Sequence, residues 1–445
     1  MQGMILNEYK TPLSWQSVPN PECGRRDVIL RVRANGLCAT DLKIADGVVP
    51  TVSLPHILGH EAAGEVVEVG AEVKSVQIGD HVTIYPTQSC GLCDYCRLGQ
   101  ENYCLTAPRS GFEVDGGFSE YFRVPERNAV KIDAQVSWEA AAIIPDALAS
   151  TYHATMQRGR IQAGETVVVV GLGGLGIHAV QMAAIMGANV IAVDIEPDKL
   201  NAAREFKPKA IVNSLQEDLP TIVKDLTAGV GADVVVECVS GSAIPSVLQA
   251  CLSCLGLGGR LVVMGYGYGL PVTMDSADLI YGQWSILGTR ASTLQDVVNV
   301  VRLVEDGKLK PMVSEIFPLE QANEDLARAV DELERLVLDL DLDVPAVEVL
   351  PVVQRVVQLG ADLDLGGCRK PEVRPVLHVA VGGGSVGGQG LKHLFRLDEK
   401  RNKAYRARSG LQASPGVGPE IADVGARHEG VFHAEVRRSQ VSAEA

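Results

Sequence analysis

The chain has 445 residues, of which 46% are hydrophobic and 21% are charged, so it contains enough apolar sequence for two or three domains with buried cores. Its formal net charge of -15 argues against a nucleic-acid-binding protein, which would carry a basic patch. Residues 1–10 lack the features of a signal peptide, and no apolar run approaches the ~18–20 residues that cross a bilayer. The sequence therefore predicts a cytoplasmic protein without membrane contacts.

Residues 1–150 are expected to form a β-rich domain. Alternating apolar residues predict short strands at 28–33, 64–70 and 79–84. Short strands at this spacing are typical of a compact, barrel-like domain.

Two fragments of this domain carry the side chains of a catalytic zinc site, Cys38-Ala39-Thr40-Asp41 and Gly59-His60-Glu61. A thiolate and an imidazole are zinc ligands, and a nearby hydroxyl could accept a proton from a substrate at an open coordination position. Either fragment alone is ambiguous, because a single Cys or His in an apolar stretch is more often a core residue.

Four cysteines are crowded between residues 88 and 106, with the spacing Cys90-x2-Cys93-x2-Cys96-x7-Cys104. In a large cytosolic chain such crowding indicates a metal site, whereas disulfides are typical of secreted chains. Four thiolates close the coordination sphere of zinc, so this zinc would stabilise the fold of a lobe that has little core of its own.

Residues 151–285 are expected to form a doubly wound parallel sheet that binds a dinucleotide. A buried strand at 166–170 precedes the glycine-rich motif, and a helix is predicted over 177–186. In this context the glycines permit a tight turn, the approach of a pyrophosphate and close helix packing. The motif reads Gly171-Leu172-Gly173-Gly174-Leu175-Gly176.

The rest of this domain indicates which nucleotide binds. The strand after the glycine motif ends at Asp194, whose carboxylate can accept hydrogen bonds from ribose hydroxyls and would repel a 2′-phosphate, so NAD is favoured over NADP. Lys199 and Arg290 are further candidates for cofactor contacts, with a surface salt bridge as the commoner alternative for Arg290. Further strands are predicted at 210–212, 232–236, 259–265 and 285–288, with helices near 197–206, 216–228 and 243–255.

From residue 1 to about 340, these motifs resemble the zinc-containing alcohol dehydrogenases of the medium-chain dehydrogenase/reductase family. The resemblance implies an α/β fold in which a GroES-like catalytic domain lies beside a Rossmann domain, with residues 286–340 returning to the catalytic domain. It implies two zinc ions per chain, one catalytic and one structural, and a homodimer or homotetramer. The implied reaction interconverts an alcohol, secondary or small primary, with its ketone or aldehyde by zinc-alkoxide formation and hydride transfer to NAD.

The resemblance also points to Asp146 as the third ligand of the catalytic zinc. Many members of the family have Cys at the matching position, and secondary-alcohol dehydrogenases have Asp. Two anions and a neutral His neutralise Zn²⁺ in either case. The alternative is that Asp146 caps a helix over 147–154.

The expected proton relay begins at Thr40, two residues after a zinc ligand. Family members often end this relay with a His five residues after the Cys, but this chain has Lys43, which is a poorer base near neutral pH. Glu61 is expected to support the ligands or to exchange with one of them, and Asp41 is expected to be structural.

Two other functions are alternatives to the dehydrogenase. One is a zinc-assisted lyase or epimerase that uses NAD transiently, and the other is a non-catalytic nucleotide-binding relative on the same fold. The presence of Cys38, Thr40 and His60 argues against the second alternative. Residues 341–445 lie beyond the part of the chain that resembles the family. Their glycine-rich, mixed-charge sequence predicts a flexible tail, with a partner-binding segment as the alternative.

Overall fold

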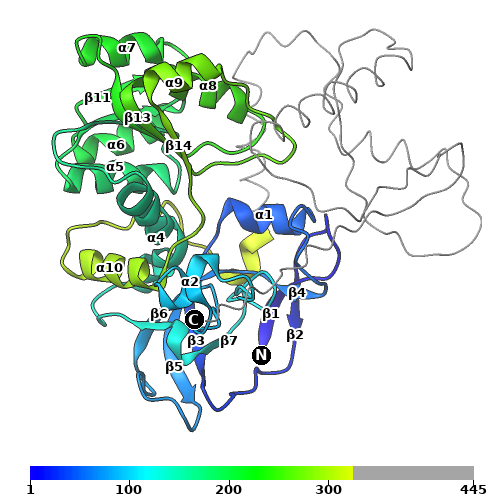
Figure 1. The fold of residues 1–445 in the computed structure, drawn as a ribbon. Helices are drawn as coiled ribbons and strands as arrows, with labels where there is room; N and C mark the ends of the chain where they lie inside the picture. Colours follow the sequence, from blue (N-terminus) through cyan, green and yellow to red (C-terminus); the bar gives the residue numbers. More distant parts are fainter. Residues whose placement is uncertain (324–445) are drawn as a thin grey trace, which may run out of the picture. The chain divides into compact units, whose positions relative to one another are not determined.

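A computed structural model of the chain divides it into two units, Met1–Val347 and Glu348–Ala445, and describes residues 1–323 of the first unit (Figure 1). The tail expected at 341–445 and the end of the segment 286–340 lie outside the described residues.

The N-terminal domain contains two antiparallel sheets, as the alternating sequence predicts. The larger sheet has the order β7(Tyr121–Pro125), β3(Asp27–Gly36), β5(Glu61–Val69), β6(His81–Ile84), β8(Ala129–Lys131). The smaller sheet has the order β2(Ser14–Ser17), β1(Gln2–Leu6), β4(His56–Ile57). Apolar residues of the larger sheet alternate into a buried core that includes Val28, Leu30 and Val66.

Short helices connect these strands: α1(Ala39–Ala45), α2(Asp94–Arg97), η1(Glu101–Tyr103), η2(Glu126–Asn128) and α3(Trp138–Ala142). Three further segments continue from α3 into the next domain, namely η3(Ile144–Leu148), α4(Ala149–Tyr152) and η4(His153–Arg158). Both η3 and η4 have wider, π-helical turns, which often occur near functional sites.

The second domain is a six-stranded parallel sheet with helices on both faces, which confirms the prediction of a doubly wound fold (Figure 1). Its strand order is β11(Ala210–Asn213), β10(Asn189–Asp194), β9(Thr166–Val170), β12(Ala232–Glu237), β13(Leu255–Val263), β14(Ser285–Gly288). Its helices are α5(Gly176–Ile185), α6(Pro197–Ala203), η5(Arg204–Phe206), α7(Leu219–Leu226), α8(Ile244–Cys254) and α9(Ser276–Gly282).

The order of the strands reverses between β9 and β12, and in open parallel sheets ligands bind at the carboxyl ends of the strands beside such a reversal. β13 begins at Leu255 instead of the expected Gly259, whereas β14 has the bounds expected for it, Ser285–Gly288.

After β14 the chain packs on the first domain. α10(Leu294–Glu305) buries Val297 and Val300 in a core shared with Tyr85 and Leu148, and η6(Leu319–Gln321) follows. Within residues 1–323, none of the helices combines the length and the hydropathy that crossing a bilayer requires.

Candidate active site

Four side chains from three separate segments meet in the first domain. Cys38 is the N-cap of α1, His60 directly precedes β5, Glu61 begins β5, and Asp146 lies in η3. Their ligand atoms all lie within 4.8 Å of one another. Asp146 Oδ2 is 3.5 Å from both Cys38 Sγ and His60 Nε2. The structure therefore brings together the three side chains expected to hold the catalytic zinc.

These distances suit a single zinc ion. Zinc–ligand bonds of about 2.0–2.3 Å in tetrahedral geometry separate the ligand atoms by roughly 3.3–3.8 Å. The His60 side chain is 5% exposed and that of Asp146 is 24% exposed, so the cluster is accessible on the side of Asp146. The alternative that Asp146 is a helix N-cap is wrong, because Asp146 lies inside the helical segment Ile144–Leu148.

The electrostatics of the cluster also favour a cation. Burial raises the pKa of the Cys38 thiol to about 11, and the charge of Asp146 adds to this effect. Burial and the charge of Asp146 likewise raise the pKa of Glu61 well above its usual range. Burial by itself would lower the pKa of His60, but the nearby Asp41 and Asp146 hold it well above 6.5. A divalent cation would stabilise the thiolate and the carboxylates that burial disfavours.

Asp41 is fully buried beside the cluster, where it contacts two of the expected zinc ligands. Its Oδ2 accepts a hydrogen bond from the backbone N–H of Cys38 at 2.9 Å, and its Oδ1 lies 3.3 Å from His60 Nδ1. A carboxylate at Nδ1 keeps that nitrogen protonated and leaves Nε2 free to bind a metal. The signal that could have revealed this role is the spacing Cys38-x-x-Asp41, which forms a capping box at the start of α1.

Two further contacts support Asp146. The hydroxyl of Ser150, one helical turn later, donates a hydrogen bond to Asp146 Oδ1. Glu61 accepts a hydrogen bond from the backbone N–H of Ala147, which is the next residue in η3. The position of Glu61 therefore fits the supporting role expected for it, whereas Ser150 carried no signal in the sequence.

Thr40 and Lys43 both lie on α1, next to Cys38. The backbone N–H of Thr40 donates to Cys38 Sγ at 3.4 Å. Lys43 is half-buried, which lowers the pKa of its ammonium group. Its Nζ lies 3.4 Å from the ring centroid of Tyr266, a residue of the second domain that sequence reasoning missed.

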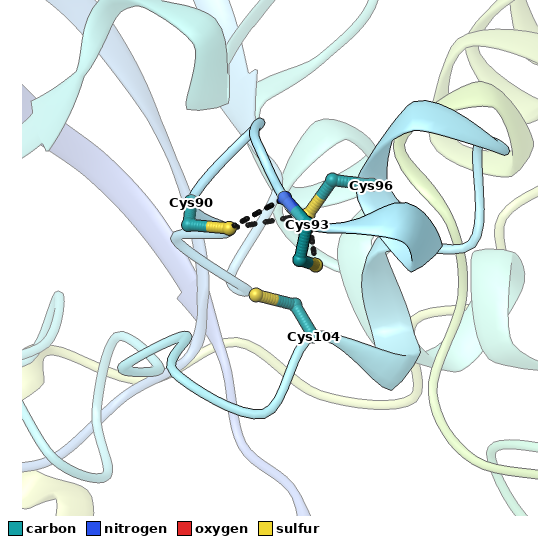
Figure 2. A group of neighbouring side chains, drawn as sticks. All are labelled: Cys90, Cys93, Cys96 and Cys104. Atoms are coloured by element: carbon teal, nitrogen blue, oxygen red, sulfur yellow. Dashed lines mark hydrogen bonds between the residues drawn. The ribbon is translucent and has the colours of Figure 1, made fainter. Parts of the chain in front are cut away.

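The four-cysteine lobe forms a second cluster, in which the four side chains point toward one another (Figure 2). Cys96 Sγ lies 3.5 Å from Cys93 Sγ and 3.8 Å from Cys90 Sγ, and tetrahedral zinc–sulfur bonds of 2.3 Å imply about 3.8 Å. Backbone N–H groups of Leu92 and Cys93 donate to Cys90 and lower its pKa to about 6, which favours the thiolate. Cys104 completes the cluster, so the lobe fits the structural zinc that was expected.

The glycine-rich motif, which includes Leu175, connects β9 to α5 at the carboxyl edge of the parallel sheet. Gly171 has a φ of +86°, and a Cβ on Gly176 would lie 1.7 Å from the carbonyl oxygen of Gly171, so only glycine fits there. Among the described residues, nothing lies within 4 Å of the position that a Cβ on Gly173 or Gly174 would take. The loop thus leaves open backbone where a pyrophosphate could approach.

Asp194 lies at the end of β10 and is buried against this loop. Its carboxylate accepts hydrogen bonds from the backbone N–H groups of Leu172, Ile195 and Glu196 at 2.6, 2.7 and 2.9 Å. A carboxylate has about four acceptor positions, so a ribose hydroxyl could still bind. Asp194 therefore holds the glycine loop, and its expected contact with the cofactor ribose stays a prediction.

The other two cofactor candidates, Lys199 and Arg290, lie outside the glycine loop. Lys199 is half-buried on α6. Arg290 follows β14 with an exposed side chain, and its backbone carbonyl accepts a hydrogen bond from Asn102 Nδ2 in the lobe.

Comparison with known proteins adds independent support. Residues 24–134 match the family model "Alcohol dehydrogenase GroES-like domain", and residues 174–306 match "Zinc-binding dehydrogenase". An alcohol dehydrogenase of Geobacillus stearothermophilus is 36% identical over 329 residues, which are 73% of this chain and 94% of the relative. A NAD-dependent alcohol dehydrogenase of Sulfolobus acidocaldarius is 32% identical over 347 residues, covering 75% and 96%.

A solved structure shares the fold as well. The crystal structure of the alcohol dehydrogenase from Aeropyrum pernix superposes with a TM-score of 0.69 at 30% identity, covering 75% of this chain and 97% of that chain. These similarities cover both domains. They agree with the two clusters of metal-binding side chains and with the glycine loop. The chain therefore belongs to the zinc-containing alcohol dehydrogenases of the medium-chain dehydrogenase/reductase family, and it is an oxidoreductase.

Proposed function

We propose that this enzyme interconverts a secondary or small primary alcohol with its ketone or aldehyde, and that it uses NAD and one catalytic zinc. The observation that supports the proposal most is the convergence of Cys38, His60 and Asp146 with Thr40 beside them on α1. A protein that only bound a nucleotide would need none of these four side chains.

In this proposal Cys38, His60 and Asp146 hold the zinc, which supplies a Lewis acid at the coordination position left open. Thr40 would accept the proton of the alcohol while it donates its own to a hydroxyl of the cofactor ribose, and Lys43 in its neutral amine form would take up the proton and release it to water. Asp41 orients His60, while Ser150 orients Asp146. Cys90, Cys93, Cys96 and Cys104 hold the structural zinc.

The cofactor in this proposal lies across the carboxyl ends of β9 and β10, where it supplies the hydride acceptor. Gly171, Gly173, Gly174 and Gly176 form the turn that the pyrophosphate approaches. Asp194 and the adjacent Glu196 would repel a 2′-phosphate, which favours NAD over NADP.

We also propose a homodimer in which the β14 edges of two copies pair. Within residues 1–323, β14 lies at the edge of the parallel sheet, so no described strand pairs with the backbone donors and acceptors on one of its sides. Exposed apolar side chains surround it, with Ile286, Ile280 and Tyr281 exposed by 43%, 69% and 82%. A second copy related by a two-fold axis would cover the same patch on both chains.

A reducing compartment such as the cytoplasm fits the cysteine chemistry. Nine cysteines within residues 1–323 are free thiols, of which five are proposed zinc ligands and the other four are buried or half-buried. Thiolate ligands are stable where thiols stay reduced.

The proposed reaction is tested by following NADH formation with a panel of small alcohols. Wild type should accumulate NADH, which also separates it from a lyase or epimerase that uses NAD transiently. Thr40→Ala should lower kcat by about 10²–10⁴-fold, whereas Thr40→Ser keeps the hydroxyl and should retain most of the activity. Absence of NADH with every alcohol, or full activity of Thr40→Ala, would contradict the proposal.

A further inference from the structure

The loop that follows β13 brings an aromatic side chain of the nucleotide-binding domain to the catalytic helix α1. The ring centroid of Tyr266 lies 3.4 Å from Lys43 Nζ, which is the geometry of a cation–π contact. Burial raises the pKa of the Tyr266 hydroxyl, and a side-chain hydrogen bond with Thr40 partly offsets this effect. One residue of the second domain thus contacts both members of the proposed proton relay.

The backbone around Tyr266 is closely packed. A Cβ on Gly265 would lie 1.7 Å from the carbonyl oxygen of Val239, and a Cβ on Gly267 would lie 3.0 Å from that of Gly241. The N–H of Gly265 donates to Glu237 at 3.3 Å, a buried carboxylate at the end of β12. The loop is therefore held against the loop after β12 on both sides of Tyr266.

A second aromatic residue supports the ring. Tyr268 meets Tyr266 edge-to-face, with ring centroids 5.5 Å apart and an interplanar angle of 89°. The contact with Tyr268 therefore helps to hold the Tyr266 ring in the orientation that faces Lys43.

We propose that Tyr266 is a positioning residue that holds Lys43 and Thr40 for proton transfer. This inference rests on the proposed function, because it concerns the relay of the same site. The ring stabilises the ammonium form that Lys43 takes once it has accepted the relayed proton, and the hydroxyl orients that of Thr40. The nucleotide-binding domain thereby contributes to proton transfer as well as to cofactor binding.

Three variants separate these contributions. Tyr266→Phe keeps the ring over Lys43 and loses the hydroxyl, and Tyr266→Leu loses both. Leu215→Ala is the control, since Leu215 is 47% exposed after β11, at the edge of the sheet opposite to β14. Loss of the ring should lower kcat by about 2- to 30-fold, the range expected for a cation–π contact. Tyr266→Leu combined with Lys43→Met should fall little below Lys43→Met alone, because both changes remove the same contact.

A second readout does not depend on activity. After ¹³C-methylation of the lysines, the methyl resonance of Lys43, assigned with Lys43→Arg, should be shifted upfield by the Tyr266 ring. Tyr266→Leu should abolish this shift, and Tyr266→Phe should keep it. An unshifted Lys43 resonance in wild type, or an unchanged kcat in Tyr266→Leu of an active enzyme, would overturn the inference. If the shift is present but no alcohol is oxidised, the contact stands and the proposed function fails.

Discussion

At the scale of single residues, His60 depends on a neighbour that is buried with it. Asp41 Oδ1 lies 3.3 Å from His60 Nδ1, while Asp41 Oδ2 binds the backbone of Cys38. One carboxylate thus orients two of the three proposed zinc ligands. Such supporting contacts commonly change metal affinity by 10- to 100-fold.

We therefore expect Asp41→Asn to weaken the binding of the catalytic zinc by about 10- to 100-fold, because the amide replaces one of the two carboxylate oxygens that face the N–H of Cys38 and Nδ1 of His60. Competition with a chelator measures the affinity, with Asp278→Asn on the exposed face of α9 as the control. The zinc in the four-cysteine lobe should be unaffected. An unchanged affinity of the catalytic zinc in Asp41→Asn would show that the carboxylate does not orient the ligands.

His178 makes folding depend on pH. It is buried in α5, its Nδ1 is 2.6 Å from the carbonyl oxygen of Gly174, and its Nε2 accepts a hydrogen bond from the N–H of Met312. Burial lowers its pKa from 6.5 to about 4, so the unfolded chain takes up a proton at a higher pH than the folded chain. The free energy of unfolding should therefore decrease as the pH falls from 6.5 towards 4.

Between about pH 7 and pH 5 this contribution should amount to about 2 kcal/mol. His178→Gln can still accept the hydrogen bond of Met312 but does not titrate, so its free energy of unfolding should vary less with pH by that amount. Urea unfolding of both proteins at the two pH values provides the comparison. Identical pH dependence in both would contradict the account of His178.

At the scale of elements, the turn between β9 and α5 contains two glycines with different constraints. Gly176 has a backbone oxygen 1.7 Å from the position of a Cβ, whereas Gly173 has open space. We expect Gly176→Ala to destabilise the domain by more than about 2 kcal/mol and to abolish NAD binding. Gly173→Ala should keep the stability of wild type and lose about 10-fold or more in NAD affinity, because its methyl group would occupy the path of the pyrophosphate.

Thermal unfolding and NAD titration of the two variants test this pair. Equal stability of both variants would contradict the packing argument for Gly176. Unchanged NAD affinity in Gly173→Ala would instead show that the pyrophosphate does not approach this glycine.

Features that are local in the chain could be predicted from the sequence. The four-cysteine lobe and the glycine turn follow from spacings of a few residues, and each parallel strand is a short apolar run. The early start of β13 at Leu255 was missed because glycines at 256, 258 and 259 resemble a loop in the sequence. Leu255 pairs with Ala232 of β12 and the pairing resumes at Arg260, so these glycines lie in an irregularity within the strand.

At the scale of the whole molecule, contacts between distant segments could not be predicted from spacing. Asp146 meets Cys38 across more than one hundred positions of the chain, and only the family resemblance pointed to it. Ser150 and Tyr266 lie in segments without any motif, so their roles depend on how the domains pack. Burial and orientation, which make Asp41 a supporting residue, likewise depend on the folded structure.

The proposed dimer also belongs to this scale. Ile286→Lys places a charge in the exposed apolar patch at β14, so we expect it to convert the dimer to a monomer. Light scattering after size-exclusion chromatography measures the mass, with Val230→Lys as a control at a position that is 69% exposed. A wild type that is already monomeric, or an Ile286→Lys protein that stays dimeric, would contradict pairing through β14.

The central claim is that Asp146, with Cys38 and His60, holds a catalytic zinc. The most direct test is the zinc content per chain of wild type, Asp146→Ala and the surface control Asp278→Ala, with NAD reduction measured on the same samples. We predict two zinc ions in wild type and in the control, and one zinc ion with no activity in Asp146→Ala. Two zinc ions in Asp146→Ala, or one zinc ion and no NAD reduction in wild type, would contradict the account.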